Sequence, residues 1–320
     1  MNLSLLSENL SNPALLFFIL GIIAVIIKSD LEIPKNSSRF ISLYLLFAIG
    51  FKGGQELSHE SFNAEIARSM LFGIVISSLI PLYAFFILRI KLNTPDSAAT
   101  AAAYGSVSAV TFVTAISFLE FHKIHNSGHM VAVMALMESP AIIVGLILIS
   151  IFKSEEKKEK LHIGSVLKHA LTNGSVVLIL GSLIIGYLAD AKQAEGIKPF
   201  TNELFKGFLA IFLLDMGISS GRKLKSFFAY GWFPIIFALA FPIFNGIVVA
   251  YLSALATPDL GNRFIFAILA ASASYIAVPA AMKISAPEAN SGLFLPMALA
   301  ITFPINITVG FPIYFGIITN

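Results

Sequence analysis

The chain contains the stretch Tyr104-Gly105-Ser106-Val107-Ser108-Ala109-Val110-Thr111 in its first half and the similar stretch Ala271-Ser272-Ala273-Ser274-Tyr275 in its second. Met134-Ala135-Leu136 and Pro140 follow the first stretch, while Met297-Ala298-Leu299 and Pro304 follow the second at similar offsets. An odd number of membrane spans in each half would place the two copies upside down relative to each other. Such inverted repeats are typical of secondary transporters, whose binding site lies where the halves meet.

The composition indicates that the bilayer is the solvent of this chain. Apolar residues make up 57% of the 320 residues and charged residues only 12%. A soluble domain of this size does not need so much apolar surface. The net charge of +3 includes no basic run of the kind that binds nucleic acid. Cysteine is absent, which excludes disulfides, thiol nucleophiles and thiolate metal sites. We expect the first apolar stretch to be a retained span and not a signal peptide.

Ten segments are apolar enough to be membrane helices, which need roughly 20 residues to cross the bilayer. The predicted fold class is therefore an all-α integral membrane protein of ten transmembrane helices in two inverted five-helix repeats. The predicted spans are Pro13–Ile27, Phe40–Phe51, Glu65–Leu88, Ser97–Leu119, Met130–Phe152, Ser175–Ala189, Phe200–Ser219, Phe227–Leu255, Arg263–Met282 and Leu293–Ile318. The first repeat then covers residues 1–152, a linker covers 153–172, and the second repeat covers 173–320.

The distribution of Lys and Arg predicts the orientation, because these residues collect on the cytoplasmic side. With the N-terminus outside, seven of the 21 basic residues face outward: Lys52, Arg68, Lys123, Lys192, Lys198, Lys206 and Arg263. The other 14 face inward. We therefore expect both termini outside and the linker in the cytoplasm. The Lys/Glu run in the linker fits a solvated helical extension, with a regulatory docking site as the alternative.

The serine-rich segments of the fourth and ninth spans are predicted helix breaks. Gly105 and the small residues permit a break, and Pro279 disfavours helix in the residue before it. A broken helix exposes backbone N–H groups and a positive dipole end, both of which attract an anion. Serine hydroxyls add further donors. The alternative is ordinary helix packing through small residues, but the repetition favours an anion site.

Glu138 is the clearest ionisable residue inside a predicted span, and a carboxylate there is costly unless it meets a cation, a partner or water. We expect the following Ser139-Pro140 to interrupt the helix and to free carbonyl groups for a hard cation such as sodium. Thr111, Thr302 and Asn306 are the neutral oxygen donors that complete the candidate sodium set. In the alternative interpretation Glu138 is protonated and only holds helices together.

The remaining polar residues predict no catalytic centre. Asp215 lies near Arg222, so a structural ion pair is favoured over a ligand role. His122, His125 and His129 fall in a loop, which argues against a zinc site. No phosphate-binding loop, serine elbow or His-Glu-x-x-His motif is present. We therefore expect neither an enzyme nor a bound cofactor, apart from sodium as the coupling ion.

In the two serine-rich segments and in Ala135-Leu136-Met137-Glu138-Ser139-Pro140, the chain resembles the sodium-dependent bicarbonate transporter superfamily, in particular its wider bacterial branch. The resemblance covers nearly the whole chain. It implies sodium-coupled uptake of bicarbonate, a homotrimer in the bacterial inner membrane, and a scaffold of spans one, two, six and seven beside a mobile core. It places the substrate at Gly105, Ser106, Ser108, Ser272 and Ser274, beside Tyr275.

The chain departs from the cyanobacterial members of that superfamily at two positions. Those members carry an aspartate where this chain has Tyr275, and another where it has Glu138. Their linker is much longer, so the resemblance does not extend to docking of their PII-like regulator. A sodium/proton antiporter, a sodium-coupled organic-acid symporter, and a membrane sensor or scaffold without flux remain as alternative functions.

Overall fold

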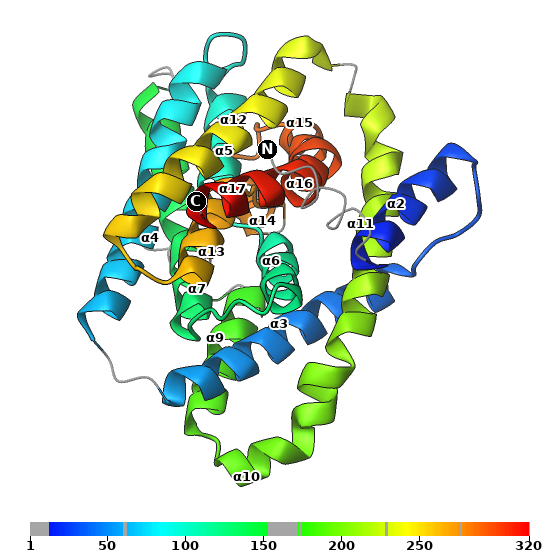
Figure 1. Cartoon of the computed structure of the whole chain (residues 1–320). Helices are drawn as coiled ribbons and strands as arrows, with labels where there is room; N and C mark the ends of the chain where they lie inside the picture. The colour runs from blue at the N-terminus through cyan, green and yellow to red at the C-terminus, as the bar shows by residue number, and fades with distance from the viewer. Residues whose placement is uncertain are drawn as a thin grey trace.

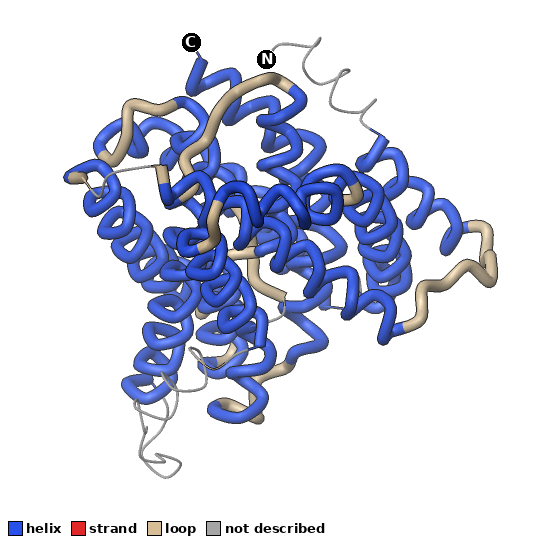
Figure 2. Tube along the Cα trace, turned by 90° about the horizontal axis from the view of Figure 1, so that it is seen from below, coloured by secondary structure: helices blue, strands red, loops and turns tan. Residues whose placement is uncertain are grey.

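The computed structural model describes residues 13–59, 63–152, 172, 174–227, 230–275 and 277–319. Every regular element in these ranges is helical, and no strand occurs in them (Figure 2). The predicted linker at residues 153–172 lies outside the described residues, apart from Thr172. The all-helical prediction is confirmed for the described part of the chain.

The described part of the first half contains six helices (Figure 1). They are α2 (Pro13–Ile26), α3 (Lys35–Ser58), α4 (Ala64–Leu88), α5 (Thr94–Gly105), α6 (Ala109–Phe121) and α7 (His129–Phe152). The second half begins with α9 (Gly174–Leu188), α10 (Ala191–Ala194), the 3-10 turn η2 (Glu195–Ile197), the π-helical η3 (Pro199–Glu203) and α11 (Phe205–Phe227). It continues with α12 (Trp232–Leu252), η5 (Ser253–Leu255), α13 (Leu260–Ala270) and α14 (Ala277–Ser285). A last run joins α15 (Ser291–Pro296), the π-helical η6 (Met297–Thr302), α16 (Phe303–Ile305), the π-helical η7 (Asn306–Gly310) and α17 (Phe311–Thr319).

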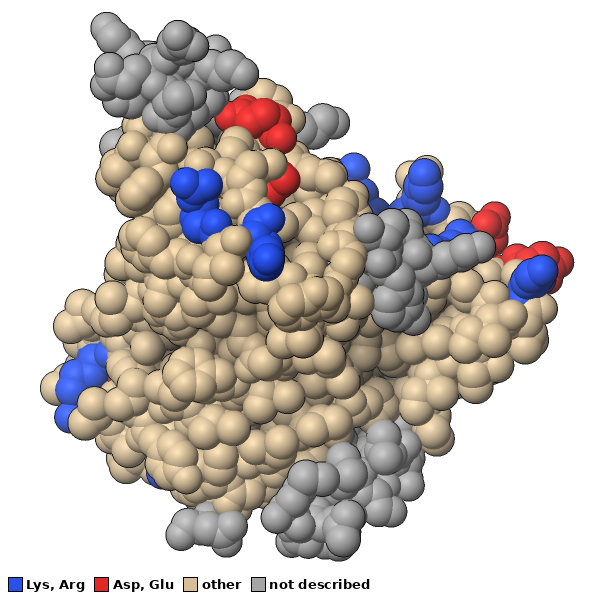
Figure 3. Space-filling view, turned by 90° about the horizontal axis from the view of Figure 1, so that it is seen from above, with Lys and Arg blue, Asp and Glu red and all other residues tan. Residues whose placement is uncertain are grey.

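Among the described residues, six helical segments are long and apolar enough to cross a membrane, which makes this a multi-pass membrane protein. They are Ala64–Leu88, Thr94–Phe121, His129–Phe152, Pro199–Lys223, Trp232–Leu255 and Ser291–Thr319. Leu15–Ile26, Val176–Leu188 and Leu260–Ala270 are apolar but shorter. The predicted second span is part of α3, which is longer than its apolar centre because the helix continues through polar residues at both ends. Figure 3 shows a face on which charged side chains are few and large areas carry none.

Two close helix crossings build one part of the molecule, α2 against α11 and α3 against α9. Glycines permit both. A β-carbon on Gly217 would overlap the Phe18 carbonyl oxygen of α2, and one on Gly186 would overlap the Phe51 carbonyl oxygen of α3. Backbones that approach this closely are typical of small-residue interfaces in membranes.

The remaining helices form a second packed group. In it, α4 packs against α5 and α7, while α12 packs against α13 and η6. The short helices α5, α6 and α13 lie in the interior, where most of their side chains are buried. Buried short helices need partners for their backbone ends inside the protein, and those ends form the candidate site.

Candidate anion and cation site

Both predicted helix breaks are observed. The first lies between the end of α5 at Gly105 and the start of α6 at Ala109, where Ser106 and Ser108 have extended backbones. The Ser108 hydroxyl caps α6 by accepting a hydrogen bond from the Thr111 amide at 3.2 Å. Serine is a favoured N-cap for this reason, so the residue that ends the break also starts the second half-helix.

The second break separates α13, which ends at Ala270, from α14, which begins at Ala277. The Ser274 hydroxyl accepts a hydrogen bond from the Val278 amide at 3.4 Å and so repeats the capping role of Ser108. Pro279 lies in the first turn of α14. An N–H group at that position has no acceptor within its own helix, so proline is tolerated there.

The two breaks touch each other through hydrogen bonds. The Ser274 amide donates to the Ala103 carbonyl at 2.8 Å. In the other direction, the Ser108 amide donates to the Ser272 hydroxyl at 3.0 Å, and that hydroxyl donates to the Leu269 carbonyl at 2.8 Å. All of these serines are at most 4% exposed, so the crossing is a buried polar junction between the halves of the chain.

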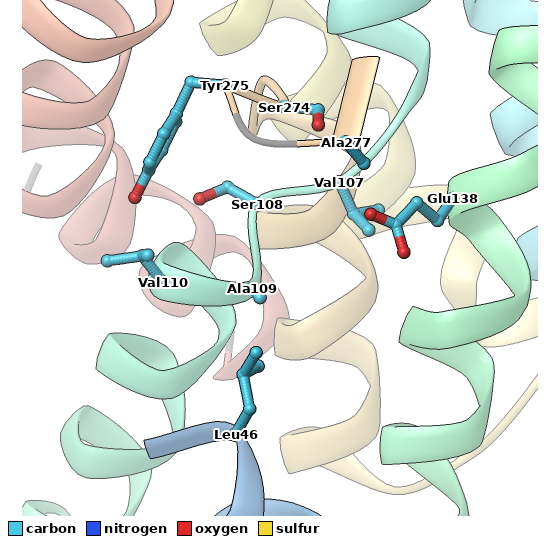
Figure 4. Close-up of a pocket in the computed structure, with 9 residues that line it drawn as sticks. All are labelled: Leu46, Val107, Ser108, Ala109, Val110, Glu138, Ser274, Tyr275 and Ala277. Carbon is cyan, nitrogen blue, oxygen red and sulfur yellow. The ribbon is translucent and has the colours of Figure 1, made fainter. Parts of the chain in front are cut away.

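A small pocket lies beside this crossing (Figure 4). Its polar lining residues are Glu138, Ser108, Ser274 and Tyr275. The apolar lining comes from Leu46, Val107, Ala109, Val110 and Ala277. Leu46 belongs to α3, whereas the other residues belong to the two breaks, the half-helices beside them and α7. The pocket therefore lies where the group of α2, α3, α9 and α11 meets the second packed group.

The structure brings only part of the predicted substrate set to this pocket. Ser108, Ser274 and Tyr275 line it, while the other three residues do not. Gly105 lies against the ring of Pro81 in α4. The Ser106 hydroxyl is 3.5 Å from the Glu138 carbonyl oxygen. The Ser272 hydroxyl accepts the hydrogen bond from the Ser108 amide that joins the two breaks. The Tyr275 hydroxyl is buried and forms no hydrogen bond of full geometry with a described residue, but the Ser108 hydroxyl faces it and points toward it in Figure 4.

Backbone amides of the lining residues were not singled out from the sequence. Ala109 and Val110 open α6, and Ala277 opens α14. Within the described ranges, no acceptor is found for these three N–H groups. Amides in the first turn of a helix are the groups that bind anions. Because any residue type supplies an amide, only the position of each break could have indicated them.

Glu138 lies on α7, which runs without interruption from His129 to Phe152. The prediction that Ser139-Pro140 interrupts this helix is wrong. Pro140 is accommodated inside it at the cost of one backbone hydrogen bond, the one its missing N–H would have donated to the Leu136 carbonyl. The half-buried Glu138 carboxylate receives no hydrogen bond or ion pair from a residue that the structure describes.

The other sodium candidates lie outside the pocket lining. Thr111 is buried in the first turn of α6. The Thr302 hydroxyl bonds to the Tyr104 hydroxyl at 2.7 Å and donates to the Ala238 carbonyl at 2.9 Å. The Asn306 amide nitrogen donates to the Ala271 carbonyl at 3.3 Å, at the start of the second break. Its Oδ1 atom is buried, and no donor reaches it from the described part of the chain.

The predicted pairing of Asp215 with Arg222 is corrected by the structure. Asp215 accepts a hydrogen bond from the Ser38 hydroxyl, and Arg222 instead pairs with Glu32 at 3.5 Å. Asp215 thus links α11 to α3 and does not line the pocket, although its carboxyl group is within electrostatic reach of Arg222 and of Tyr275. The His122 ring lies among Phe118, Phe121 and Phe315. No cluster of metal-ligating side chains occurs among the residues described.

Polar half-helix ends that meet inside a multi-pass helical protein are the arrangement that secondary transporters use to bind ions and small solutes. The family model for the Na+-dependent bicarbonate transporter superfamily matches residues 13–319, and the chain belongs to this superfamily. A comparison with curated proteins found no match.

Proposed function

We propose that this protein imports bicarbonate together with sodium, and that both bind at the pocket beside the crossing of the two helix breaks. The observation that carries the proposal is the set of donors at one place. Three hydroxyls, from Ser108, Ser274 and Tyr275, join the free amides of the first turns of α6 and α14. A planar oxyanion needs several donors around its oxygen atoms, and these groups supply them.

The charges around the pocket support coupling to a cation. No Lys or Arg is among the described residues that line it, and Glu138 adds a negative charge when ionised. Two helix N-termini alone offset part of one anionic charge. A sodium ion between the anion and the Glu138 carboxylate would neutralise both. Each ligand would then raise the affinity for the other by the same factor.

We propose further that the two halves are inverted repeats, and matched contacts between the halves support this. The pairing of α2 with α11 corresponds to that of α9 with α3. At the start of α5, the Asp96 carboxylate accepts a hydrogen bond from the backbone N–H of Asn290, which precedes α15. At the start of α13, Asn262 accepts one from the Ser127 amide before α7. Helices at equivalent positions in the two halves are therefore linked by equivalent hydrogen bonds.

The family resemblance supports two further parts of the proposal, a homotrimer in the bacterial inner membrane and movement of the second packed group against α2, α3, α9 and α11. The distribution of Lys and Arg supports the position of both termini outside. Gly105, Ser106 and Ser272 would support the substrate region, and Thr111, Thr302 and Asn306 would belong to the sodium region. A PII-like regulator is not part of the proposal.

Uptake of labelled bicarbonate into proteoliposomes tests the function directly. We expect uptake to require an inward sodium gradient, and a matched potassium gradient serves as the control. A sodium flux that depends on pH and is independent of bicarbonate would support the antiporter alternative instead. Bicarbonate uptake abolished by excess acetate, together with acetate uptake of its own, would support the organic-acid alternative. Binding of bicarbonate without any flux would indicate a sensor.

A further inference from the structure

The four serines of the two breaks differ in what their hydroxyl hydrogens do. A serine hydroxyl has one hydrogen to donate and two lone pairs to accept with. Ser108 and Ser274 each accept from an amide of their own half-helix. The Ser108 hydroxyl also faces the hydroxyl of Tyr275, which lines the same pocket, and no described residue accepts the hydrogen of Ser274. Ser272 accepts from the Ser108 amide and donates its only hydrogen to the Leu269 carbonyl. A hydroxyl that binds an anion must donate its hydrogen to it, and the Ser272 hydroxyl already donates its only hydrogen to the Leu269 carbonyl.

We propose that Ser272 is a positioning residue that ties the two helix breaks together, and that Ser108 and Ser274 are the serines that donate to the anion. This inference rests on the proposed function for the identity of the anion. It also separates residues that the sequence pattern treats alike, since Ser106-Val107-Ser108 and Ser272-Ala273-Ser274 have the same spacing.

The geometry of the crossing shows why a hydroxyl is needed at position 272. Ser274 and Leu269 each lie 166 positions after Ser108 and Ala103. On one side of the crossing the Ser274 amide reaches the Ala103 carbonyl directly at 2.8 Å. On the equivalent side, the Ser108 amide reaches the Leu269 carbonyl only through the Ser272 hydroxyl, with bonds of 3.0 and 2.8 Å. The Ser272 hydroxyl fills a gap that the matching side does not have.

The same bond fixes the donors of the first half-helix. The Ser108 amide is held by Ser272, and the next two amides, those of Ala109 and Val110, belong to residues that line the pocket. A segment anchored at the N-cap points its first-turn amides in one direction. Loss of the Ser272 hydroxyl would leave the Ser108 N–H buried without a partner, which is unfavourable and releases the segment.

The natural absence of cysteine allows a direct experiment. Single Ser108→Cys, Ser272→Cys and Ser274→Cys variants of the full chain are reconstituted and treated with a small cationic methanethiosulfonate reagent. We expect the first and third to be labelled, and bicarbonate with sodium to slow that labelling. We expect the Ser272→Cys variant to react about tenfold or more slowly and to be insensitive to bicarbonate, because Ser272, unlike Ser108 and Ser274, does not line the pocket and a thiol without access to the reagent is inert. Fast labelling of this variant with protection by bicarbonate would overturn the inference.

The outcomes separate this inference from the proposed function. If the variants at 108 and 274 are labelled but bicarbonate with sodium protects neither, the proposed substrate is wrong, while an inert thiol at 272 still supports the positioning role. A second measurement guards against disruption by the cysteine itself. Adding Ser272→Ala to the Ser108→Cys protein should speed labelling at position 108 if Ser272 restrains that segment, and an unchanged rate in a correctly assembled protein would contradict the restraint.

Discussion

Replacement of Glu138 by glutamine removes the one acidic group among the described residues that line the pocket, while the shape of the side chain is kept. Two unit charges roughly 4 Å apart attract by about 1 kcal/mol in water and by about 4 kcal/mol at an effective dielectric constant of about 20. Glu138 is half-buried and has no described partner that would compensate its charge. We therefore expect the sodium affinity to fall by roughly tenfold or more, equivalent to about 1.4 kcal/mol.

The assay is bicarbonate uptake as a function of sodium concentration at fixed bicarbonate. Glu203→Gln provides a matched control, because Glu203 is an exposed acid on η3 away from the pocket. It should leave the sodium curve unchanged, and Glu138→Asp should give an intermediate curve because it keeps the charge on a shorter side chain. Superimposable curves for Glu138→Gln and the unmodified protein would refute the ligand role and leave the protonated, helix-linking interpretation.

Three further predictions concern packing, ion pairing and topology. Gly217→Val should lower the free energy of unfolding by roughly 1–3 kcal/mol or more, because its β-carbon would overlap the Phe18 carbonyl oxygen. Gly207→Val on the same helix meets no atom within 4 Å and should not lower the melting temperature in detergent. Lys52→Glu breaks the ion pair between Lys52 and Glu120, two side chains that are 35% and 32% exposed. We expect the free energy of unfolding to fall by about 0.2–1 kcal/mol, and the additional change Glu120→Lys to restore it in the double variant. A cysteine at position 154 should resist membrane-impermeant thiol reagents in intact cells, since the charge distribution places it in the cytoplasm.

Each of these three predictions has an outcome that would contradict it. Equal melting temperatures for the two valine variants would mean that α2 and α11 do not cross at Gly217. A double exchange at positions 52 and 120 that is no more stable than the single change would show that the pair contributes nothing. Ready labelling at position 154 would reverse the predicted orientation of every span.

The helix breaks could be predicted from the sequence because their causes are local. Ser108 and Ser274 are good N-caps, and Gly105 and the neighbouring small residues tolerate a break. Pro140 shows the limit of that reasoning. It resembles Pro279 as a residue type, but α7 continues through it, and Pro279 lies in a first turn that needs no N–H. The difference depends on the tertiary packing around each proline, which a single sequence does not reveal.

The partners of the polar side chains were predicted less well, because they depend on which helices meet. Arg222 lies seven positions after Asp215 on α11, yet it pairs with Glu32, and Asp215 bonds to Ser38. Both contacts depend on which residues lie beside α11, and nothing in the spacing of the charged residues indicates that neighbourhood. In the same way, only the structure of the two crossed breaks shows that the Ser272 hydroxyl donates its hydrogen to the Leu269 carbonyl.

The proposed internal repeat also accounts for the presence of an acidic side chain on only one side of the crossing. Glu138 precedes Pro140 by two positions, and Thr302 precedes Pro304 by two positions, so Thr302 is the counterpart of the acid. The Tyr104 hydroxyl lies against Thr302 at 2.7 Å, and Thr302 donates to a backbone carbonyl. These two hydroxyls therefore satisfy each other and carry no net charge. The two proposed repeats supply similar breaks that both contribute donors to the pocket, and the one acid among its described lining residues, Glu138, comes from α7 of the first.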